Sequence, residues 1–187
     1  MKNLIIISAP SGAGKTTLCK ALQSEFSDIK WSVSYTTRKK RKTEKNGIDY
    51  NFISNLEFKK LINISFFAEW EEVHGFYYGT SKLNLEQAIK KNEMLLIEMD
   101  VKGALSIKKL YPNKTFSIFI TPPSIDHLRN RLQKRGTDSK DRINIRLRRF
   151  KEEMKYVSRF DFNLLNDEYK LAKNQLMSII LEMKKGE

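Results

Sequence analysis

The chain has 187 residues, 40% of them hydrophobic and 30% charged, which suits a single domain able to bury a core, with room for inserted lobes. No apolar run approaches the roughly 20 residues that a membrane span requires, and the one cysteine, Cys19, excludes an internal disulfide bond. We therefore expect a cytoplasmic protein with no membrane-spanning or targeting segment.

The formal net charge of +13 indicates anionic partners or high solubility and says nothing about the fold. The basic residues form two clusters. Residues 38–45 hold six basic residues and one acid, and residues 129–151 hold ten basic residues and two acids. Such clusters are typical of a nucleic-acid-binding protein and equally of an enzyme that handles two phosphate-bearing ligands.

Short β-rich runs alternate with helical periods along the chain, a pattern typical of an α/β domain with a parallel sheet. The first run, Leu4–Ser8, is continuously apolar, as expected of a strand buried on both faces. A tight loop at 11–14 follows, and a helix is predicted from Lys15 to about Phe26. Four more strands are predicted, at 29–33, 94–99, 116–120 and 160–165.

Three further helices are predicted in the last third of the chain. Ser124 can cap the first of them, and Gly136 ends it. A basic helix and a C-terminal helix follow, each with an apolar stripe. The apolar residues of the three helices are, in chain order, Leu128 and Leu132, then Ile143, Leu147, Phe150 and Met154, then Ala172, Leu176, Ile179, Ile180 and Met183.

Two segments interrupt the alternating pattern. Residues 34–80 contain aromatic residues in short strand-like pieces, at 50–52 and 76–78, and are interpreted as an inserted lobe. Residues 124–156 are interpreted as a second lobe, a helical lid. A single domain is therefore expected, with a core formed by residues 1–33, 81–123 and 157–187.

Residues 9–16, Ala-Pro-Ser-Gly-Ala-Gly-Lys-Thr, lie between a predicted strand and a predicted helix, the context that makes a Walker A phosphate loop credible. The first position is Ala rather than the consensus Gly. The two glycines allow successive N–H groups to point at phosphate oxygens, and the helix N-terminus adds partial positive charge. Lys15 can reach the β- and γ-phosphates, and the Thr16 hydroxyl can ligate Mg²⁺. We expect ATP and Mg²⁺ to bind through Ser11, Gly12, Ala13, Gly14, Lys15, Thr16 and Thr17.

Several further motifs, in order and at consistent spacing over essentially the whole chain, resemble the guanylate kinase family. They are residues 32–38 (SVSYTTR), Arg41, Glu44, Gly47, 49–50 (DY), Phe52, 67–70 (FAEW), 73–80 (VHGFYYGT), 100–104 (DVKGA), Arg131, Arg135, Gly136, Arg146, Asn166 and Asp167. The resemblance implies a three-layer α/β/α P-loop fold with a central parallel sheet, an inserted GMP-binding lobe and a helical lid. It implies transfer of the ATP γ-phosphoryl group to GMP or dGMP.

The residues suit these roles chemically. A carboxylate can accept the adjacent N1–H and exocyclic NH₂ of guanine together, which suits Glu69, while Ser34 and Thr80 can hydrogen-bond near O6. A buried polar group left unpaired by a wrong base costs about 1–3 kcal/mol, enough to discriminate. Arg38 and Arg41 can grip the acceptor phosphate bidentately. Tyr50 and Tyr78 can donate hydroxyls to the same phosphate.

The remaining site residues follow from the resemblance. It implies that Asp100, at the carboxyl end of a core strand, orients GMP or the water around the metal, and that Asn166 lies on the adenine side. Together with Lys15 and Arg38, the predicted catalytic residues are the lid arginines Arg131, Arg135 and Arg146, which would stabilise the charge of the moving phosphoryl group and exclude water. No general base is expected, because the acceptor phosphate oxygen is already anionic.

Other charged residues are interpreted as solvated surface: Arg148, Arg149 and Lys151 as one exposed helix face. The sequence departs from the family pattern at Lys40, Thr43, Phe76 and Lys102, where the family usually has Pro, Gly, Asn and Gln. None of these four is assigned to catalysis.

Three alternatives remain on the residues alone. A non-catalytic module of the same family would be expected to lose the phosphate loop or the lid arginines, which this chain keeps. Another nucleoside monophosphate kinase would act on AMP or UMP, which Glu69 argues against. A nucleic-acid-binding protein would interleave its arginines with stacking aromatics along a groove. The expected partners are therefore ATP and GMP or dGMP, with no specific nucleic acid or membrane, in a monomer or a homo-oligomer.

Overall fold

A five-stranded, all-parallel sheet lies at the centre of the computed structural model, which describes residues 2–73, 75–136 and 139–185 but not the side chain of Arg135. The strand order is β2-β7-β1-β8-β9. This sheet confirms the predicted α/β class with a central parallel sheet. Its strands are β1 (Leu4–Ser8), β2 (Lys30–Trp31), β7 (Leu95–Met99), β8 (Thr115–Thr121) and β9 (Phe162–Leu165).

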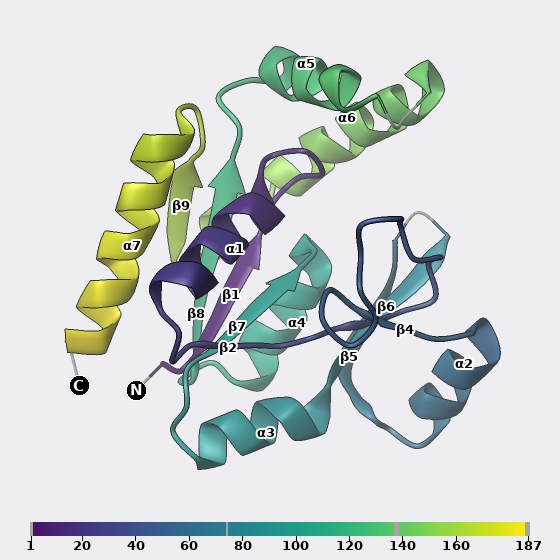
Figure 1. Cartoon of the computed structure of the whole chain (residues 1–187), viewed down its shortest axis with the longest axis vertical. Helices are drawn as coiled ribbons and strands as arrows, with labels where there is room; N and C mark the ends of the chain where they lie inside the picture. Colours follow the sequence, from purple (N-terminus) through teal and green to yellow (C-terminus); the bar gives the residue numbers. More distant parts are fainter. Residues whose placement is uncertain (1, 74, 137–138, 186–187) are drawn as a thin grey trace.

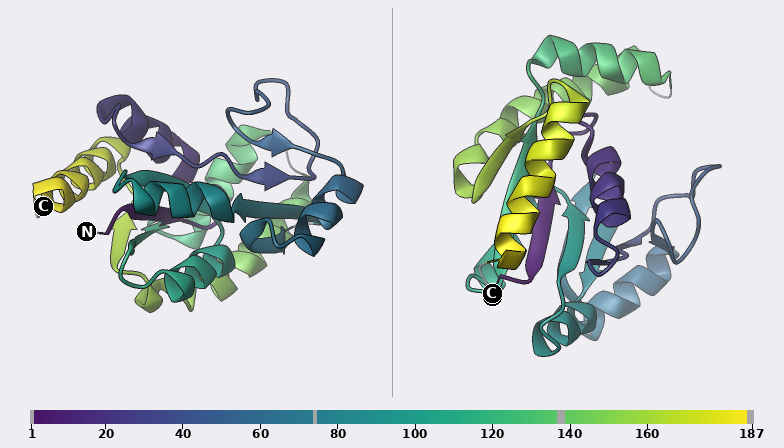
Figure 2. Two further views of the ribbon diagram at one scale, coloured as in Figure 1. Left: turned by 90° about the horizontal axis from the view of Figure 1, so that it is seen from below. Right: turned by 60° about the vertical axis from the view of Figure 1, so that its left-hand side comes forward.

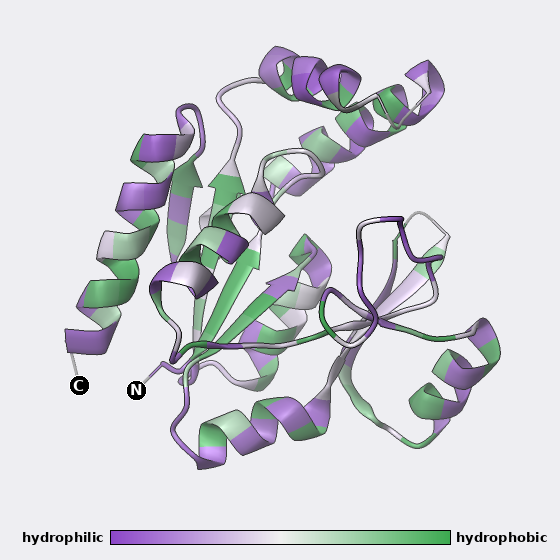
Figure 3. Ribbon diagram, in the orientation of Figure 1, coloured by the Kyte–Doolittle hydropathy of each residue, from purple (hydrophilic) through white to green (hydrophobic). Residues whose placement is uncertain are grey.

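Helices cover both faces of this sheet and complete three layers (Figures 1 and 2). One face packs against α1 (Lys15–Glu25) and α7 (Tyr169–Lys185), and the other against α3 (Lys82–Lys90) and α4 (Val101–Leu110). Strand β1 is fully buried because its side chains alternate between the two cores: Ile5 and Ile7 join the first, and Leu4 and Ile6 the second. Figure 3 shows that the strands at the centre of the sheet are largely hydrophobic, as burial on both faces requires.

The parallel register brings two functional segments to one edge of the sheet. Ser8 of β1 pairs with Met99 of β7, so the loop that follows β1 and the residue that follows β7, Asp100, emerge side by side. Ligands in open α/β sheets bind at this carboxyl edge.

A second, four-stranded sheet, ordered β4-β3-β6-β5, lies beside the central sheet (Figure 1). Its aromatic core includes Phe58 of α2, which stacks on Phe67 and Tyr77 with ring centroids 4.5 and 5.4 Å apart. A capping box between Ser54 and Glu57 starts that helix. The elements are β3 (Tyr35–Thr36), β4 (Asn51–Phe52), α2 (Asn55–Asn63), β5 (Phe67–Val73) and β6 (Phe76–Ser81).

Two antiparallel helices, α5 (Ile125–Arg135) and α6 (Lys140–Met154), lie over the carboxyl edge of the central sheet, at the top of Figure 1. Ser124 and Ser139 cap them, each accepting a hydrogen bond from a backbone N–H three residues on. Leu128 and Leu132 of α5 pack against Ile143 and Leu147 of α6 in a small apolar core of their own.

The five predicted core strands are all present: β1 has the predicted ends, and the ends of the other four differ. Strand β2 spans only two residues of the predicted 29–33, because just Lys30 and Trp31 pair with β7. Strand β9 begins at Phe162, since a 3₁₀ turn at Val157–Arg159 occupies the chain just before it. Helices α2, α3 and α4 were not predicted individually. No helix in the described part of the chain is long and apolar enough to cross a membrane.

Candidate active site

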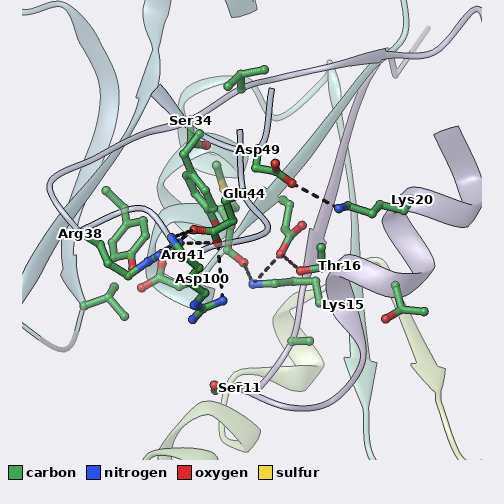
Figure 4. A pocket seen from close by; sticks show the side chains of 18 of the residues that line it. Ser11, Lys15, Thr16, Lys20, Ser34, Arg38, Arg41, Glu44, Asp49 and Asp100 are labelled. Carbon is green, nitrogen blue, oxygen red and sulfur yellow. Dashed lines mark hydrogen bonds and ion pairs between the residues drawn. The ribbon is translucent and has the colours of Figure 1, made fainter. Parts of the chain in front are cut away.

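A cavity of about 1800 Å³ lies between the carboxyl edge of the central sheet, the second sheet and helix α6. Side chains from the phosphate loop, the second sheet and the lid line it together. Figure 4 shows Lys15, Thr16, Arg38, Glu44 and Asp100 gathered around this space.

The phosphate loop has the backbone of an anion-binding turn. Gly12 and Gly14 have φ of +93° and +95°, and the Ala13 N–H donates to the Pro10 carbonyl at 3.0 Å. Helix α1 starts at Lys15, directly after the loop. Unpaired N–H groups and the partial positive charge of the helix N-terminus therefore face the cavity, as an incoming phosphate requires.

Lys15 and Thr16 both contact the end of β7. The Lys15 ammonium donates to the Met99 carbonyl at 3.0 Å and lies 4.0 Å from a Glu98 carboxylate oxygen. The Thr16 hydroxyl donates to the same Glu98 oxygen at 2.7 Å. Glu98 was not among the predicted site residues, although it lies on a buried strand two residues before Asp100.

The lid touches the phosphate loop directly. A Cβ added at Gly12 would lie 2.9 Å from Leu132 Cδ2 and 3.0 Å from Leu128 Cδ1, so only glycine allows α5 to approach this closely. Arg146 of α6 donates to the Ser11 hydroxyl. The lid and loop therefore form one wall of the cavity.

Asn166 hydrogen-bonds to the backbone of the phosphate loop. Its side chain is 5% exposed, and its amide donates to the Ala13 carbonyl at 2.7 Å. Arg131 in turn donates to the Asn166 and Asp167 carbonyls, at 2.9 and 3.2 Å. In this geometry Asn166 joins the loop, β9 and the lid helix α5.

Arg38 and Glu44, which both line the cavity, form a bidentate ion pair with nitrogen–oxygen distances of 3.0 and 2.8 Å. The side chains are 13% and 12% exposed. Burial alone would raise the pKa of Glu44, but the hydrogen bonds and charges of Arg38 and Arg41 together outweigh burial and hold that pKa below its ordinary value. The backbone N–H and guanidinium of Arg41 also lie on Glu44, at 2.7 and 3.6 Å.

Two tyrosines surround the Arg38 guanidinium. The Tyr50 ring centroid lies 5.5 Å from Arg38 Cζ, and the Tyr50 and Tyr78 rings meet edge to face at 6.0 Å. Burial raises the pKa of Tyr50 far above neutral pH, so the phenol keeps its proton and can donate it to an acceptor. The side chains form a compact set of donors for one anion.

Glu69 lies deeper in the cavity. The Thr80 hydroxyl donates to its Oε1 at 2.6 Å, and Oε2 lies so near α4 that a Cβ on Gly103 would come within 2.7 Å of it. Burial, with a contribution from the charge of Asp100, raises the pKa of Glu69 to about 7. Ser34, which is buried, also lines the cavity.

Asp100 is held by two elements. Its Oδ1 accepts the Gly103 N–H at 2.8 Å and so caps α4, while Arg149 of α6 donates to Oδ2 at 3.4 Å. Arg149 also donates to Glu153 at 2.9 Å, and burial raises the pKa of that carboxyl. The interpretation of Arg149 as solvated surface is therefore wrong, although its neighbours Arg148 and Lys151 are exposed as predicted.

One cavity collects most of the residues predicted for both ligands. Arg135 lies on α5, and its side chain is outside the described residues. Ala13 and Asn166 are buried supports of the loop. The predicted residues that line the cavity are Ser11, Gly12, Gly14, Lys15, Thr16, Thr17, Ser34, Arg38, Arg41, Tyr50, Glu69, Tyr78, Thr80, Asp100, Arg131 and Arg146.

A Walker A loop on a parallel sheet, with a cluster of arginines and tyrosines and a pair of helices around the same cavity, is the arrangement of a P-loop phosphotransferase. The guanylate kinase family model matches residues 1–183. The chain is 44% identical over 181 residues to a guanylate kinase of Desulfitobacterium hafniense, covering 97% of this chain and 90% of the relative. It is also 44% identical over 177 residues to one from Helicobacter pylori, covering 95% and 85%.

Comparison with solved structures leads to the same family as comparison of sequences. A guanylate kinase from Anaplasma phagocytophilum superposes with a TM-score of 0.81 at 29% identity, covering 96% of this chain and 85% of that one. A dephospho-CoA kinase from Campylobacter jejuni shares the fold alone, with a TM-score of 0.53 at 18% identity over 100% and 99% of the two chains. The chain belongs to the guanylate kinase family and is an ATP-dependent kinase of purine nucleotide metabolism that phosphorylates GMP.

Proposed function

We propose that this ATP:GMP phosphotransfer takes place with ATP bound on the phosphate loop and GMP or dGMP bound on the second sheet, giving ADP and GDP or dGDP. The observation that carries this assignment is the buried Glu69–Thr80 pair, which shares a cavity with Lys15 and with the Arg38 cluster. Under this proposal, residues 34–80 are the GMP-binding lobe and 124–156 the lid of a single domain.

Guanine recognition falls to Glu69, Thr80 and Ser34. An ionised Glu69 accepts from N1–H and the exocyclic NH₂ together, a donor pair that adenine and uracil do not present. Thr80 keeps the carboxylate oriented through its 2.6 Å hydrogen bond, and with Ser34 it serves the O6 side. Because these groups are buried, a base that leaves them unpaired loses about 1–3 kcal/mol per group.

The phosphates fall to the basic side chains. Arg38, Arg41, Tyr50 and Tyr78 hold the acceptor phosphate, with Arg38 steered by Glu44. Lys15 and the loop N–H groups hold the phosphates of ATP.

The lid arginines Arg131, Arg135 and Arg146 offset the charge that spreads over the moving phosphoryl group, and closure of the lid excludes water. The acceptor oxygen attacks the γ-phosphorus and the bond to the β-phosphate oxygen breaks, leaving that oxygen on ADP.

The site fits Mg²⁺. Thr16 offers a hydroxyl and Glu98 a carboxylate, hard oxygen donors 2.7 Å apart next to the loop. Among the described residues there is no cluster of three or more metal-binding side chains, which suits an ion bound largely by ATP oxygens and water. Held there by Thr16 and Glu98, Mg²⁺ would supply positive charge that offsets the charge of the phosphates during transfer.

We further assign the enzyme to the cytoplasm, where ATP and GMP are available, with no specific nucleic acid or membrane as partner. The single cysteine, Cys19, is buried and free, as suits a reducing compartment.

The decisive experiment is a coupled ADP-release assay with ATP, in which GMP, AMP, UMP and CMP are offered separately, with and without Mg²⁺. Turnover on GMP alone, dependent on Mg²⁺, is expected. Glu69→Gln should raise the KM for GMP about 100-fold, because one of two charge-assisted hydrogen bonds is lost. Glu72→Gln, on the exposed face of the same strand, is the matched control. Equal turnover on AMP, or equal behaviour of the two variants, would contradict the assignment of Glu69.

A further inference from the structure

One face of α6 faces the cavity with four charged residues. Arg142, Arg146, Arg149 and Glu153 are spaced by four, three and four positions, so they lie along a single helical face, and all four line the cavity. Arg146 is one of the arginines proposed to offset the charge of the moving phosphoryl group. Arg149 has none, although it reaches across to the central sheet.

Arg149 makes two charge-assisted contacts with different elements. Its Nε donates to Glu153 Oε1 at 2.9 Å within α6, which fixes the side chain against its own helix. Its Nη2 donates to Asp100 Oδ2 at 3.4 Å, from the lid to the end of β7. The side chain is 29% exposed, so water screens the pair only in part.

The two oxygens of Asp100 have separate partners, and this fixes the carboxylate plane. Oδ1 accepts from the Gly103 N–H, which belongs to the first turn of α4, and Oδ2 faces Arg149. Among the described residues, loss of Arg149 would leave the helix cap as the hydrogen bond that holds Asp100, and the second oxygen could turn in the cavity beside Glu69.

We propose that Arg149 is a positioning residue of the acceptor site, which acts through Asp100 by tying lid helix α6 to the end of β7. The inference rests on the proposed function and on the role in orienting GMP that the family resemblance implies for Asp100. Arg149 also offsets two carboxylates, those of Asp100 and Glu153, beside the space that an acceptor phosphate dianion must enter. Like charges left unbalanced there would repel the phosphate.

The two contacts predict a selective defect. Arg149→Gln removes the charge but keeps a side chain of similar length, so GMP binding should weaken about tenfold, the scale of losing one partly screened charge pair. Binding of ATP should change less than about twofold, because the ion pairs of Arg149 within the described part of the chain are with Asp100 and Glu153, outside the phosphate loop. Arg149→Lys keeps the charge without the fork and should recover part of the affinity.

The experiment compares Arg149→Gln, Arg149→Lys and Arg148→Gln in the full chain. Arg148 is the matched control, since it is the adjacent arginine on α6 and is exposed. The measurements are the Kd of GMP by calorimetry without ATP, the KM of each substrate, kcat and the melting temperature. A tenfold weaker GMP complex in Arg149→Gln, with Arg148→Gln unchanged, is the expected result.

A second background tests whether the effect passes through Asp100. In Asp100→Asn protein, which keeps the oxygen that caps α4, Arg149→Gln should weaken GMP binding less than about twofold further, because the partner charge is already gone. Additive losses, equal behaviour of Arg149→Gln and Arg148→Gln, or equal losses for ATP and GMP would each overturn the inference. The proposed function fails separately, if the unaltered chain does not phosphorylate GMP in the same assay.

Discussion

Recognition of guanine by this chain should depend on pH near neutrality. Glu69 is buried among Thr80, Gly103 and the neighbouring charge of Asp100, and its pKa is raised to about 7. Only the ionised carboxylate can accept both guanine N–H groups, because a protonated carboxyl has given one oxygen a proton of its own. Acid should therefore weaken GMP binding by removing the acceptor rather than by unfolding the site.

The magnitude follows from that pKa. With a pKa of about 7, Glu69 is about nine-tenths ionised at pH 8 and about one-tenth ionised at pH 6. If only the ionised form binds GMP well, the apparent Kd should rise about tenfold between these two pH values, which equals about 1.4 kcal/mol.

The assay is calorimetric titration of GMP into the ligand-free protein at pH 6, 7 and 8. Glu69→Gln is the control, since the GMP phosphate itself titrates in this range and contributes equally to both proteins. The wild-type slope should exceed the Glu69→Gln slope by about one log unit between pH 8 and pH 6. Parallel slopes would refute the assignment, because they would show that Glu69 does not titrate in the binding range.

Glu69 should also make the free energy of unfolding depend on pH. Folding raises the pKa of Glu69 from an ordinary 4.5 to about 7, so between these values the folded chain holds more protons than the unfolded chain. Its contribution to the free energy of unfolding therefore falls as pH rises from about 4.5 to 7, by about 3 kcal/mol in all. Urea unfolding of the wild type and Glu69→Gln across this range would measure the difference.

Two further substitutions test the ends of the cavity. Glu44→Gln should lower the free energy of unfolding by about 1–3 kcal/mol and raise the KM for GMP more than the KM for ATP, because it leaves the mostly buried Arg38 without its bidentate partner. Urea unfolding and steady-state kinetics would measure these two effects. An unchanged KM for GMP would contradict the prediction. Gly12→Ala should cost about 1–3 kcal/mol of stability and raise the KM for ATP, since the residue has φ +93° and lies against Leu132. Gly136→Ala is its control, with φ +66° and open space around it, and an equal loss in both variants would rule out the contact with the lid.

Physical reasons explain which parts of the fold could be predicted. The strands β1, β7 and β8 were predicted because apolar runs buried on both faces are bounded by glycine, proline or a charged residue. Helices α3 and α4 were missed because each begins within two residues of the end of the preceding strand, at Lys82 and Val101, so no glycine or proline marks the boundary. The two-residue β2 is shorter than predicted because sheet pairing, and not the apolar pattern, ends a strand.

Site residues could be predicted where they lie close together in one sequence motif. Lys15 and Thr16 belong to one continuous loop motif, and Glu69 stood within a recognisable run. Arg149 could not be assigned, because its partner Asp100 is 49 positions away and the pairing depends on how α6 lies over the central sheet. The sequence shows which residues share a face of helix α6 with Arg149. Only tertiary packing determines which face of that helix lies over the cavity.

The same ion pairs bear on the class of protein. A chain of net charge +13 suggests a free basic surface, yet three arginines of this cavity form ion pairs with acids. Arg38 and Arg41 share Glu44, and Arg149 lies between Asp100 and Glu153. A phosphate that enters must compete with carboxylates, which favours a small dianion held by several forks at once over a long backbone that meets one charge at a time. The arrangement of the acids, more than the number of basic residues, therefore separates a nucleotide kinase from a nucleic-acid-binding protein here.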